Sequence, residues 1–167
     1  MHDTALNNAR SFVDRYLSDK RGLSVLDVGG ADVNGSLRSL FEDRGHSYMA
    51  LDVREDHGVD IVAKEGEPFP IGDNEFDVIV SSSMMEHDPC FWRTFDDMVR
   101  VCKIGGLIYL CVPSRGEHHW GRDCWRFLSD AYPALESWNS SVTLLSHYID
   151  LSGHWKDNIG IFQKFRI

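Results

Sequence analysis

Short apolar runs alternate with segments of helical spacing along most of this chain. Between the runs, apolar residues recur every three or four positions, which is typical of amphipathic helices. We expect strands at 23–28, 47–52, 59–62, 76–80 and 107–112, and helices at 4–18, at about 35–44 and from Asp88 onward. Strands that alternate with helices predict a parallel sheet covered on both faces.

The last third of the chain breaks this alternation. Two more strands are expected at 141–147 and 159–165, and the link between them is too short for a helical crossover, so they should pair antiparallel. The pattern therefore predicts an α/β fold: a doubly wound, mostly parallel seven-stranded sheet with an antiparallel C-terminal hairpin. Without repeats or linkers, residues 1–167 should form a single domain, with the helix of residues 1–22 packed on its core.

Several local signals predict where helices begin and end. Asp88-Pro89 has the form of an N-cap followed by a first-turn proline, and Gly105-Gly106 should end that helix. A further helix is expected after residue 130, with Leu135 and Trp138 on its buried side.

Candidate ligand-binding residues follow the first two strands. Asp27 lies at the end of the first strand, and Gly29 and Gly30 form the turn after it. Open α/β sheets bind ligands at this edge, and glycine lets backbone approach a ligand. Asp52 ends the second strand, roughly 20 residues past the glycines, where a carboxylate can reach a nucleotide ribose. The alternative is a tight turn with two solvated strand-end acids.

Four segments, taken in order, resemble the class I S-adenosylmethionine-dependent methyltransferases. They are 26–38 (LDVGGADVNGSLR), 48–52 (YMALD), 68–89 (PFPIGDNEFDVIVSSSMMEHDP) and 92–113 (WRTFDDMVRVCKIGGLIYLCVP). The first is similar to the DVG-x-x-DVNGS-x-R motif of a compact branch, and the later DCWRF at 123–127 resembles another recurring segment of that branch. The resemblance covers most of 23–165 and implies a Rossmann-like methyltransferase fold, S-adenosyl-L-methionine as cofactor, and methyl transfer by in-line displacement.

The resemblance also implies a set of cofactor contacts. Asp27 would hold the cofactor's amino group or orient the loop, and Asp52 would accept hydrogen bonds from both ribose hydroxyls. Relatives often carry an acid after the third strand for the adenine amino group, but a charged Lys64 cannot accept a hydrogen bond, so a backbone amide or Glu65 would substitute. The full set is Asp27, Gly29, Gly30, Asp32, Asn34, Asp52, Val53, Ser81, Ser82 and Ser83.

Methyl transfer from a sulfonium requires alignment and at most one base, so a catalytic triad is not expected. The candidates are His87, His118, His119 and Asp123. The last three lie in segment 115–127, which follows the fifth strand and is rich in His, Trp and Arg. Such side chains suit a sugar or a carboxylated acceptor.

Each of these residues also has a structural interpretation. Asp123 could pair with Arg126, Trp125 and Phe127 could be core residues, and His87 could shape the site without acid–base work. Adjacent histidines can indicate a metal, but no third ligand stands at a recognisable spacing, so none is expected.

Composition limits the range of partners. The formal charge of −9 argues against non-specific nucleic-acid binding, and no apolar stretch approaches the roughly 18 residues of a bilayer span. Four cysteines without CxxC spacing and an N-terminus unlike a secretory signal favour a cytoplasmic location. We expect a small-molecule or glycan-like acceptor, and a nucleophile on a macromolecule stays open as an alternative. A partner chain or second copy could complete an open site.

Two other functions remain open at this point. A nicotinamide-dependent oxidoreductase would share the sheet, but the missing GxGxxG motif and the final antiparallel pair argue against it. A non-catalytic assembly or structural module is compatible with Lys64, and with Ala31 and Val33 where a common pattern has glycine.

Overall fold

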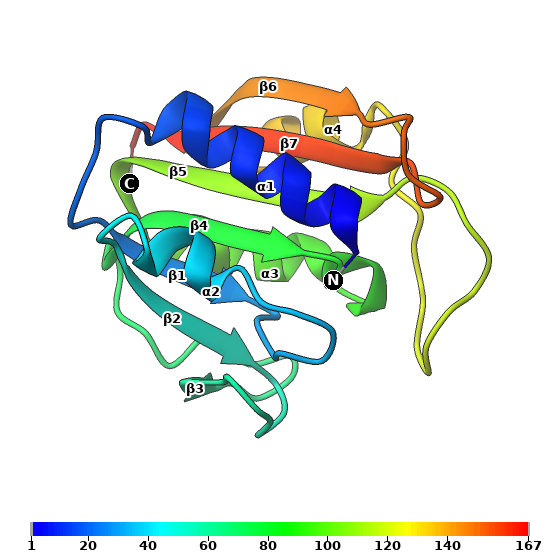
Figure 1. Ribbon diagram of the computed structural model, residues 1–167, viewed down its shortest axis with the longest axis horizontal. Coiled ribbons are helices and arrows are strands. Elements are labelled where there is room, and N and C mark those ends of the chain that lie inside the picture. Colours follow the sequence, from blue (N-terminus) through cyan, green and yellow to red (C-terminus); the bar gives the residue numbers. More distant parts are fainter. Residues whose placement is uncertain (1, 167) are drawn as a thin grey trace.

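The computed structural model describes residues 2–166, which form a seven-stranded sheet in the order β3-β2-β1-β4-β5-β7-β6 (Figure 1). The strands are β1 Ser24–Val28, β2 Ser47–Asp52, β3 Ile61–Val62, β4 Phe76–Ser82, β5 Cys102–Pro113, β6 Val142–Ile149 and β7 Asp157–Lys164. The helices are α1 Asp3–Tyr16, α2 Arg38–Glu42, the 3-10 turn η1 Met85–His87, α3 Phe91–Val101 and α4 Ala131–Trp138.

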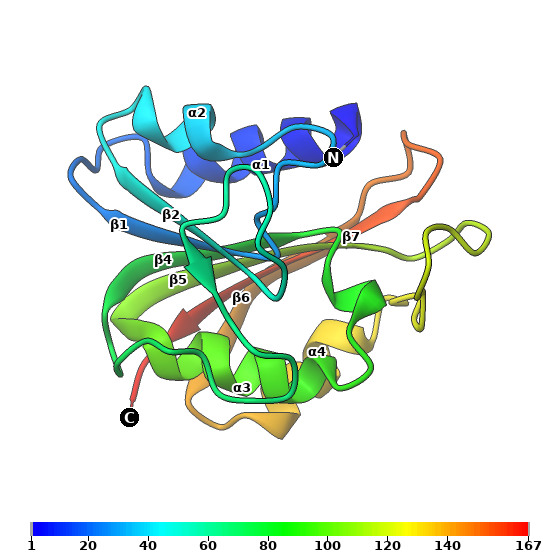
Figure 2. The same ribbon diagram turned by 90° about the horizontal axis from the view of Figure 1, so that it is seen from below.

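Strands β1 to β5 run parallel, whereas β7 is antiparallel to both of its neighbours, β5 and β6. This arrangement confirms the predicted sheet and its C-terminal hairpin. Helices α1 and α2 cover one face of the sheet, and α3 and α4 cover the other (Figure 2). The carboxyl ends of the parallel strands therefore share one edge.

The apolar runs correspond to strands that are buried on both faces. In β4, Val78 and Val80 pack in the core cluster under α1, which contains Phe12. Ile79 belongs to the opposite cluster, which contains Phe95 of α3. Because both faces are covered, the strand is continuously apolar rather than alternating.

Two predicted helix boundaries are wrong. Helix α3 begins at Phe91, not at Asp88-Pro89. Asp88 has extended backbone, the conformation that a following proline favours, and its carboxylate accepts a hydrogen bond from the Cys90 N–H at 2.8 Å. The same helix already ends at Val101, and Gly105-Gly106 lies within β5.

Other elements are shorter than expected or expose a residue that was expected to be buried. Helix α2 spans five residues and β3 only two. Trp138 is 59% exposed rather than buried, because its indole N–H donates to the carboxylate of Asp96 on α3. Within residues 2–166, none of the helices has the length and apolarity that crossing a membrane requires.

Candidate functional site

A cavity of about 1160 Å³ opens at the edge where the parallel strands end. Of the predicted site residues, ten line it: Asp27, Gly29, Gly30, Asn34, Asp52, Val53, Ser82, Ser83, His87 and His119. This volume is at the upper end for small-molecule sites, so the cavity has room for a nucleotide-sized ligand and a second small molecule.

Asp27 lies at the floor of this cavity and is almost fully buried. The hydroxyl of Tyr48 on β2 donates a hydrogen bond to its carboxylate. Burial raises the pKa of Asp27 to about 6, the Tyr48 hydrogen bond counteracts that rise, and the nearby Asp52 adds to it. Sequence reasoning missed Tyr48, because its role depends on the register of two strands.

The two glycines after β1 are required by protein packing. Their N–H groups both donate to the carbonyl of Leu51, at 2.8 and 3.1 Å. Gly29 has φ +81°, and a Cβ there would lie 2.2 Å from Cγ of Met84. A Cβ on Gly30 would lie 2.8 Å from Cβ of Ala50. The turn thus lies close to the ligand space because β2 and Met84 hold it there.

Asp52 ends β2 beside the same space and is 8% exposed. Its Oδ1 accepts a hydrogen bond from the backbone N–H of Arg54 at 3.0 Å, and the Arg54 Nε lies 3.6 Å away. The carboxylate is therefore fixed in orientation, while the half-exposed Val53 forms part of the cavity wall.

Four predicted site residues do not line the cavity: Asp32, Ser81, His118 and Asp123. Asp32 accepts a hydrogen bond from the Gly35 N–H at 2.9 Å and so stabilises the loop before α2. Ser81 lies within β4, not after it, and its hydroxyl donates to the Val28 carbonyl at 2.7 Å. His118 is an exposed residue of the loop that follows β5.

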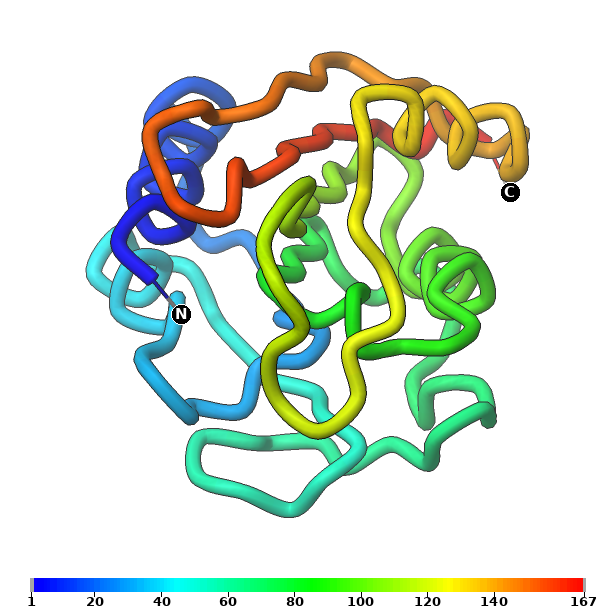
Figure 3. The backbone as a smooth tube through the Cα atoms, turned by 90° about the vertical axis from the view of Figure 1, so that its right-hand side faces the viewer, coloured from blue at the N-terminus to red at the C-terminus, as the bar shows by residue number. Residues whose placement is uncertain are grey.

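That loop, residues 114–128, runs across the ends of the strands (Figure 3). The nearly fully buried carboxylate of Asp123 holds it together. Asp123 accepts hydrogen bonds from Arg126, with both N–O distances 2.6 Å, and from the backbone and ring nitrogens of His119, both at 2.9 Å. Arg126 holds the pKa of Asp123 well below its usual range. The structural interpretation of Asp123 is thus the one that the contacts support.

The two aromatic residues of the same loop behave differently. Phe127 is buried, as expected. Trp125 is 38% exposed, so the prediction that it belongs to the core is wrong. Its indole N–H donates to the Asp88 carbonyl at 2.8 Å, which ties the loop to the segment before α3.

The residues on the β3 side of the cavity bear on which group could accept a hydrogen bond from the adenine amino group. The side chain of Lys64 is exposed and pairs with Glu67 at 3.6 Å. Glu65 forms an ion pair with Arg122 of the loop and so joins the two rims of the cavity. Neither contact provides a fixed side-chain acceptor inside the cavity, which leaves the backbone after β3 for such a contact.

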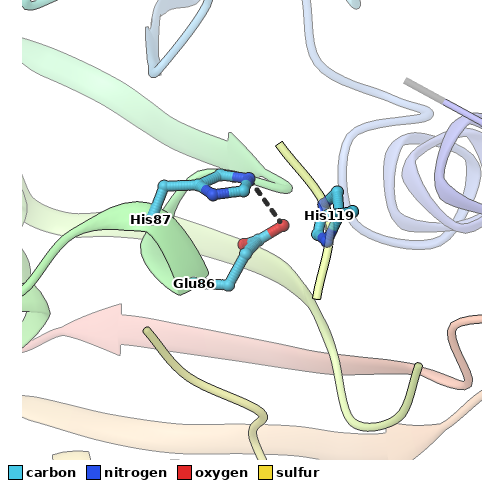
Figure 4. Close-up of side chains that lie close together, drawn as sticks. All are labelled: Glu86, His87 and His119. Atoms are coloured by element: carbon cyan, nitrogen blue, oxygen red, sulfur yellow. Dashed lines mark ion pairs between the residues drawn. The ribbon is translucent and has the colours of Figure 1, made fainter. Parts of the chain in front are cut away.

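A second cluster of polar groups borders the cavity at Glu86, His87 and His119 (Figure 4). Glu86 is fully buried, and neither oxygen of its carboxyl has a hydrogen-bond partner among residues 2–166. Burial raises the pKa of this group to about 8. The Nε2 of His87 lies 3.7 Å from its Oε1. The sequence analysis selected His87 but not Glu86 as a site residue.

Comparisons with known proteins agree with this geometry. Residues 2–145 match the family model described as methyltransferase domain. An uncharacterized methyltransferase of Mycobacteroides abscessus is 36% identical over 104 residues, which cover 54% of this chain and 39% of that protein. The chain thus matches less than half the length of this relative.

Solved structures share the fold at low sequence identity. A Burkholderia thailandensis 1,6-didemethyltoxoflavin-N1-methyltransferase, solved with 1,6-didemethyltoxoflavin and S-adenosylhomocysteine, superposes with TM-score 0.76 and 16% identity over 98% of this chain and 80% of that chain. A SAM-dependent methyltransferase from Aquifex aeolicus gives TM-score 0.64 and 17% identity over 99% of this chain and 100% of that chain.

Proposed function

This chain belongs to the class I S-adenosylmethionine-dependent methyltransferase family, and from that membership we propose that it transfers the cofactor's methyl group to a nucleophilic acceptor. The observation that carries the proposal is the placement of Asp27 and Asp52 in one cavity at the carboxyl ends of β1 and β2. When bound, S-adenosylmethionine supplies a methyl group on a sulfonium, which a nucleophile displaces directly.

The cavity residues fit this cofactor. Asp27 offers a buried carboxylate to a cationic amino group, and the opposite charge would favour its ionised form. Asp52 offers an oriented carboxylate that can accept two hydroxyl hydrogen bonds from a ribose. The exposed wall at Val53 is apolar and suits the face of an adenine ring.

The chain's own residues have few tasks in such a reaction. Asp27 and Asp52 fix the ligand's position, and the loop of residues 114–128 lies where the acceptor must approach. Alignment of this kind is the main source of rate when the leaving group is already activated. A base is required only if the acceptor carries a proton at working pH.

The acceptor in this proposal is a small molecule or a glycan-like group. The loop supplies Trp120 and Arg122 to the cavity lining, and an exposed aromatic ring beside a guanidinium suits a sugar or a carboxylate. The net charge of −9 disfavours sequence-independent binding to nucleic acid. A partner chain or second copy could complete the open side of the cavity.

Calorimetry with S-adenosylhomocysteine tests the proposal. Wild-type protein should bind one equivalent, and Asp52→Ala should weaken binding by roughly 1–3 kcal/mol, the usual cost of removing hydrogen bonds from a buried group. Glu55→Ala is the matched control, because Glu55 is an exposed acid on the same loop that does not line the cavity.

Equal affinity of wild type and Asp52→Ala would remove Asp52 from the site. No binding by the wild type at any accessible concentration would contradict the proposed cofactor. Binding without turnover on any class of acceptor would favour the non-catalytic module instead.

A further inference from the structure

We propose that Glu86, His87 and His119 form a mononuclear site for a divalent transition metal at the acceptor side of the cavity. The role that we give to the metal rests on the proposed function, whereas metal binding itself does not depend on it. One ligand atom from each of these residues lies within 4.8 Å of the other two. A shared ion can be reached from such positions by small side-chain movements.

The first step of the argument is the state of Glu86. Its side chain has no exposed surface, and within the described part of the chain both carboxyl oxygens lack a hydrogen-bond partner. Burying a carboxyl group without hydrogen-bond partners costs folding free energy, and native structures rarely contain such a group. A bound cation would supply the missing partner, since carboxylate oxygen is an ordinary ligand for divalent metals.

The second step is the orientation of the two imidazoles. Nδ1 of His87 lies 2.5 Å from the carbonyl oxygen of Arg122, and Nδ1 of His119 lies 2.9 Å from Oδ2 of Asp123. A carbonyl can only accept, so His87 carries its proton on Nδ1. At His119, the 2.9 Å contact with the Asp123 carboxylate favours the same tautomer over the longer contact of Nδ1 with the donor Nη2 of Arg126 at 3.4 Å. Each Nε2 then keeps its lone pair. Metal-binding histidines are commonly held in this way, by a backbone carbonyl or a carboxylate at the other nitrogen.

The third step is the charge of the surroundings. Arg126, a cation that acts on Glu86, donates to both oxygens of Asp123, so its charge is compensated there. Asp157 contributes a further negative charge near Glu86. With Glu86 ionised, the ligand set carries one negative charge and two neutral imidazoles, as in catalytic zinc sites with two histidines and one glutamate.

The position of the cluster indicates what the metal would do. All three residues line the cavity, so a fourth coordination position would face the ligand space. A hydroxyl or carboxylate oxygen of the acceptor could occupy it. A coordinated hydroxyl loses its proton to water more readily, because the metal stabilises the oxyanion. The proposal therefore names an oxygen nucleophile as the acceptor class.

Sequence spacing could not have revealed this site. The expectation of no metal considered the adjacent pair His118 and His119. The fold separates them: His119 faces the cavity beside η1, whereas His118 is exposed and does not line it. The missing ligands come from Glu86 and His87, which precede α3.

The test is calorimetric titration of tag-free, metal-stripped protein with Zn²⁺ in the presence of a competing chelator. Wild type should bind one equivalent. Glu86→Gln, which keeps the shape of the side chain, and His119→Ala, in the loop, should each weaken Zn²⁺ by more than about 100-fold, beyond the 10–100-fold typical of losing an outer-shell partner. His118→Ala, the neighbouring histidine, should bind as the wild type does.

Co²⁺ provides a second readout at the same site. It should give the visible absorption of a tetrahedral or five-coordinate ion in wild type and His118→Ala, and lose it in Glu86→Gln and His119→Ala. Wild-type protein that binds neither ion, or variants that bind both ions like the wild type, would overturn the proposal.

Titration of the same proteins with S-adenosylhomocysteine in metal-free buffer distinguishes failure of the metal site from failure of the proposed function. The metal variants should retain cofactor affinity, while Asp52→Ala should bind the cofactor more weakly and retain Zn²⁺ affinity. Failure of Zn²⁺ binding with intact cofactor binding contradicts only the metal site. Failure of cofactor binding with intact Zn²⁺ binding contradicts only the proposed function.

Discussion

The Tyr48 hydroxyl donates a hydrogen bond to the carboxylate of Asp27, from the second strand of the sheet to the end of the first. Both side chains are more than nine-tenths buried. Burial alone would leave Asp27 protonated well above its ordinary range, and the hydrogen bond from Tyr48 favours the ionised form. Tyr48 therefore helps to set the pH at which this acid carries its charge.

The affinity for S-adenosylhomocysteine should depend on this charge. The pKa of Asp27 is raised to about 6, and an ionised Asp27 attracts the ligand's cationic amino group, so affinity should fall as the pH drops below about 6, by up to about tenfold per pH unit. Removing the donor in Tyr48→Phe raises the pKa of Asp27 further and should move the decline to higher pH. Calorimetry between pH 5 and 7.5 measures both profiles.

Asp27→Asn is the control for the other titratable residues of the cavity, among them Glu86, His87 and His119, which it leaves in place. Its affinity should be lower than that of the wild type and nearly constant over the same pH range. Identical pH profiles in wild type and Asp27→Asn would show that another group carries the dependence.

A second prediction concerns the stability of the turn after β1. Gly29→Ala must accept φ +81° and a clash of its Cβ with Met84, whereas Gly22→Ala must accept φ +67° with no atom within 4 Å. Gly22→Ala should therefore cost about 1–2 kcal/mol of unfolding free energy, and Gly29→Ala about 1–3 kcal/mol more. Urea denaturation of both variants gives the difference.

The double variant Gly29→Ala, Met84→Ala identifies the cause. Measured against Met84→Ala alone, the glycine substitution should cost less than it does in the wild type, because the Cγ at 2.2 Å is gone, but more than it does at Gly22, because the Met84 Cβ at 2.5 Å remains. A cost equal to that in the wild-type background would show that Met84 beyond its Cβ is not the obstruction.

Much of the fold could be predicted because its signals are local. Each buried strand is a continuous apolar run, and the short link between β6 and β7 required antiparallel pairing. Two of the wrong predictions concern side chains that are both apolar and hydrogen-bonding. Trp125 and Trp138 were assigned to buried positions for their apolar rings, yet their indole N–H groups bond to Asp88 and Asp96 at the surface.

The candidate site also has residues that the sequence could predict and contacts that it could not. Asp27 and Asp52 could be selected because each follows a predicted strand, and parallel strands end at one edge. The contact of Asp27 with Tyr48 depends on strand register, and the proximity of Glu86 to His119 depends on how a long loop folds back. Neither is encoded in spacing along the chain.

A third prediction concerns how Asp123 holds the loop over the cavity. Asp123→Asn removes the charge that Arg126 and His119 contact and should cost about 1–3 kcal/mol of unfolding free energy. The pKa of Asp123 in the folded protein is depressed, so its stabilisation is present above the unfolded pKa of about 3.9 and is lost only as the pH falls through the folded value. The difference between wild type and variant should therefore be constant from pH 5 to 8.

Hydrogen exchange locates the effect, and urea denaturation at several pH values measures it. Protection should fall in residues 115–127 and remain unchanged in β1 and β2, so cofactor affinity should be nearly that of the wild type. Glu117→Gln is the matched control, because the exposed carboxylate of Glu117 pairs with His154 in solvent, where an ion pair contributes little, so this variant should be nearly as stable as the wild type. If Asp123→Asn were as stable as Glu117→Gln, or if its deficit disappeared between pH 5 and 8, the ion pair with Arg126 would not be what holds the loop in place.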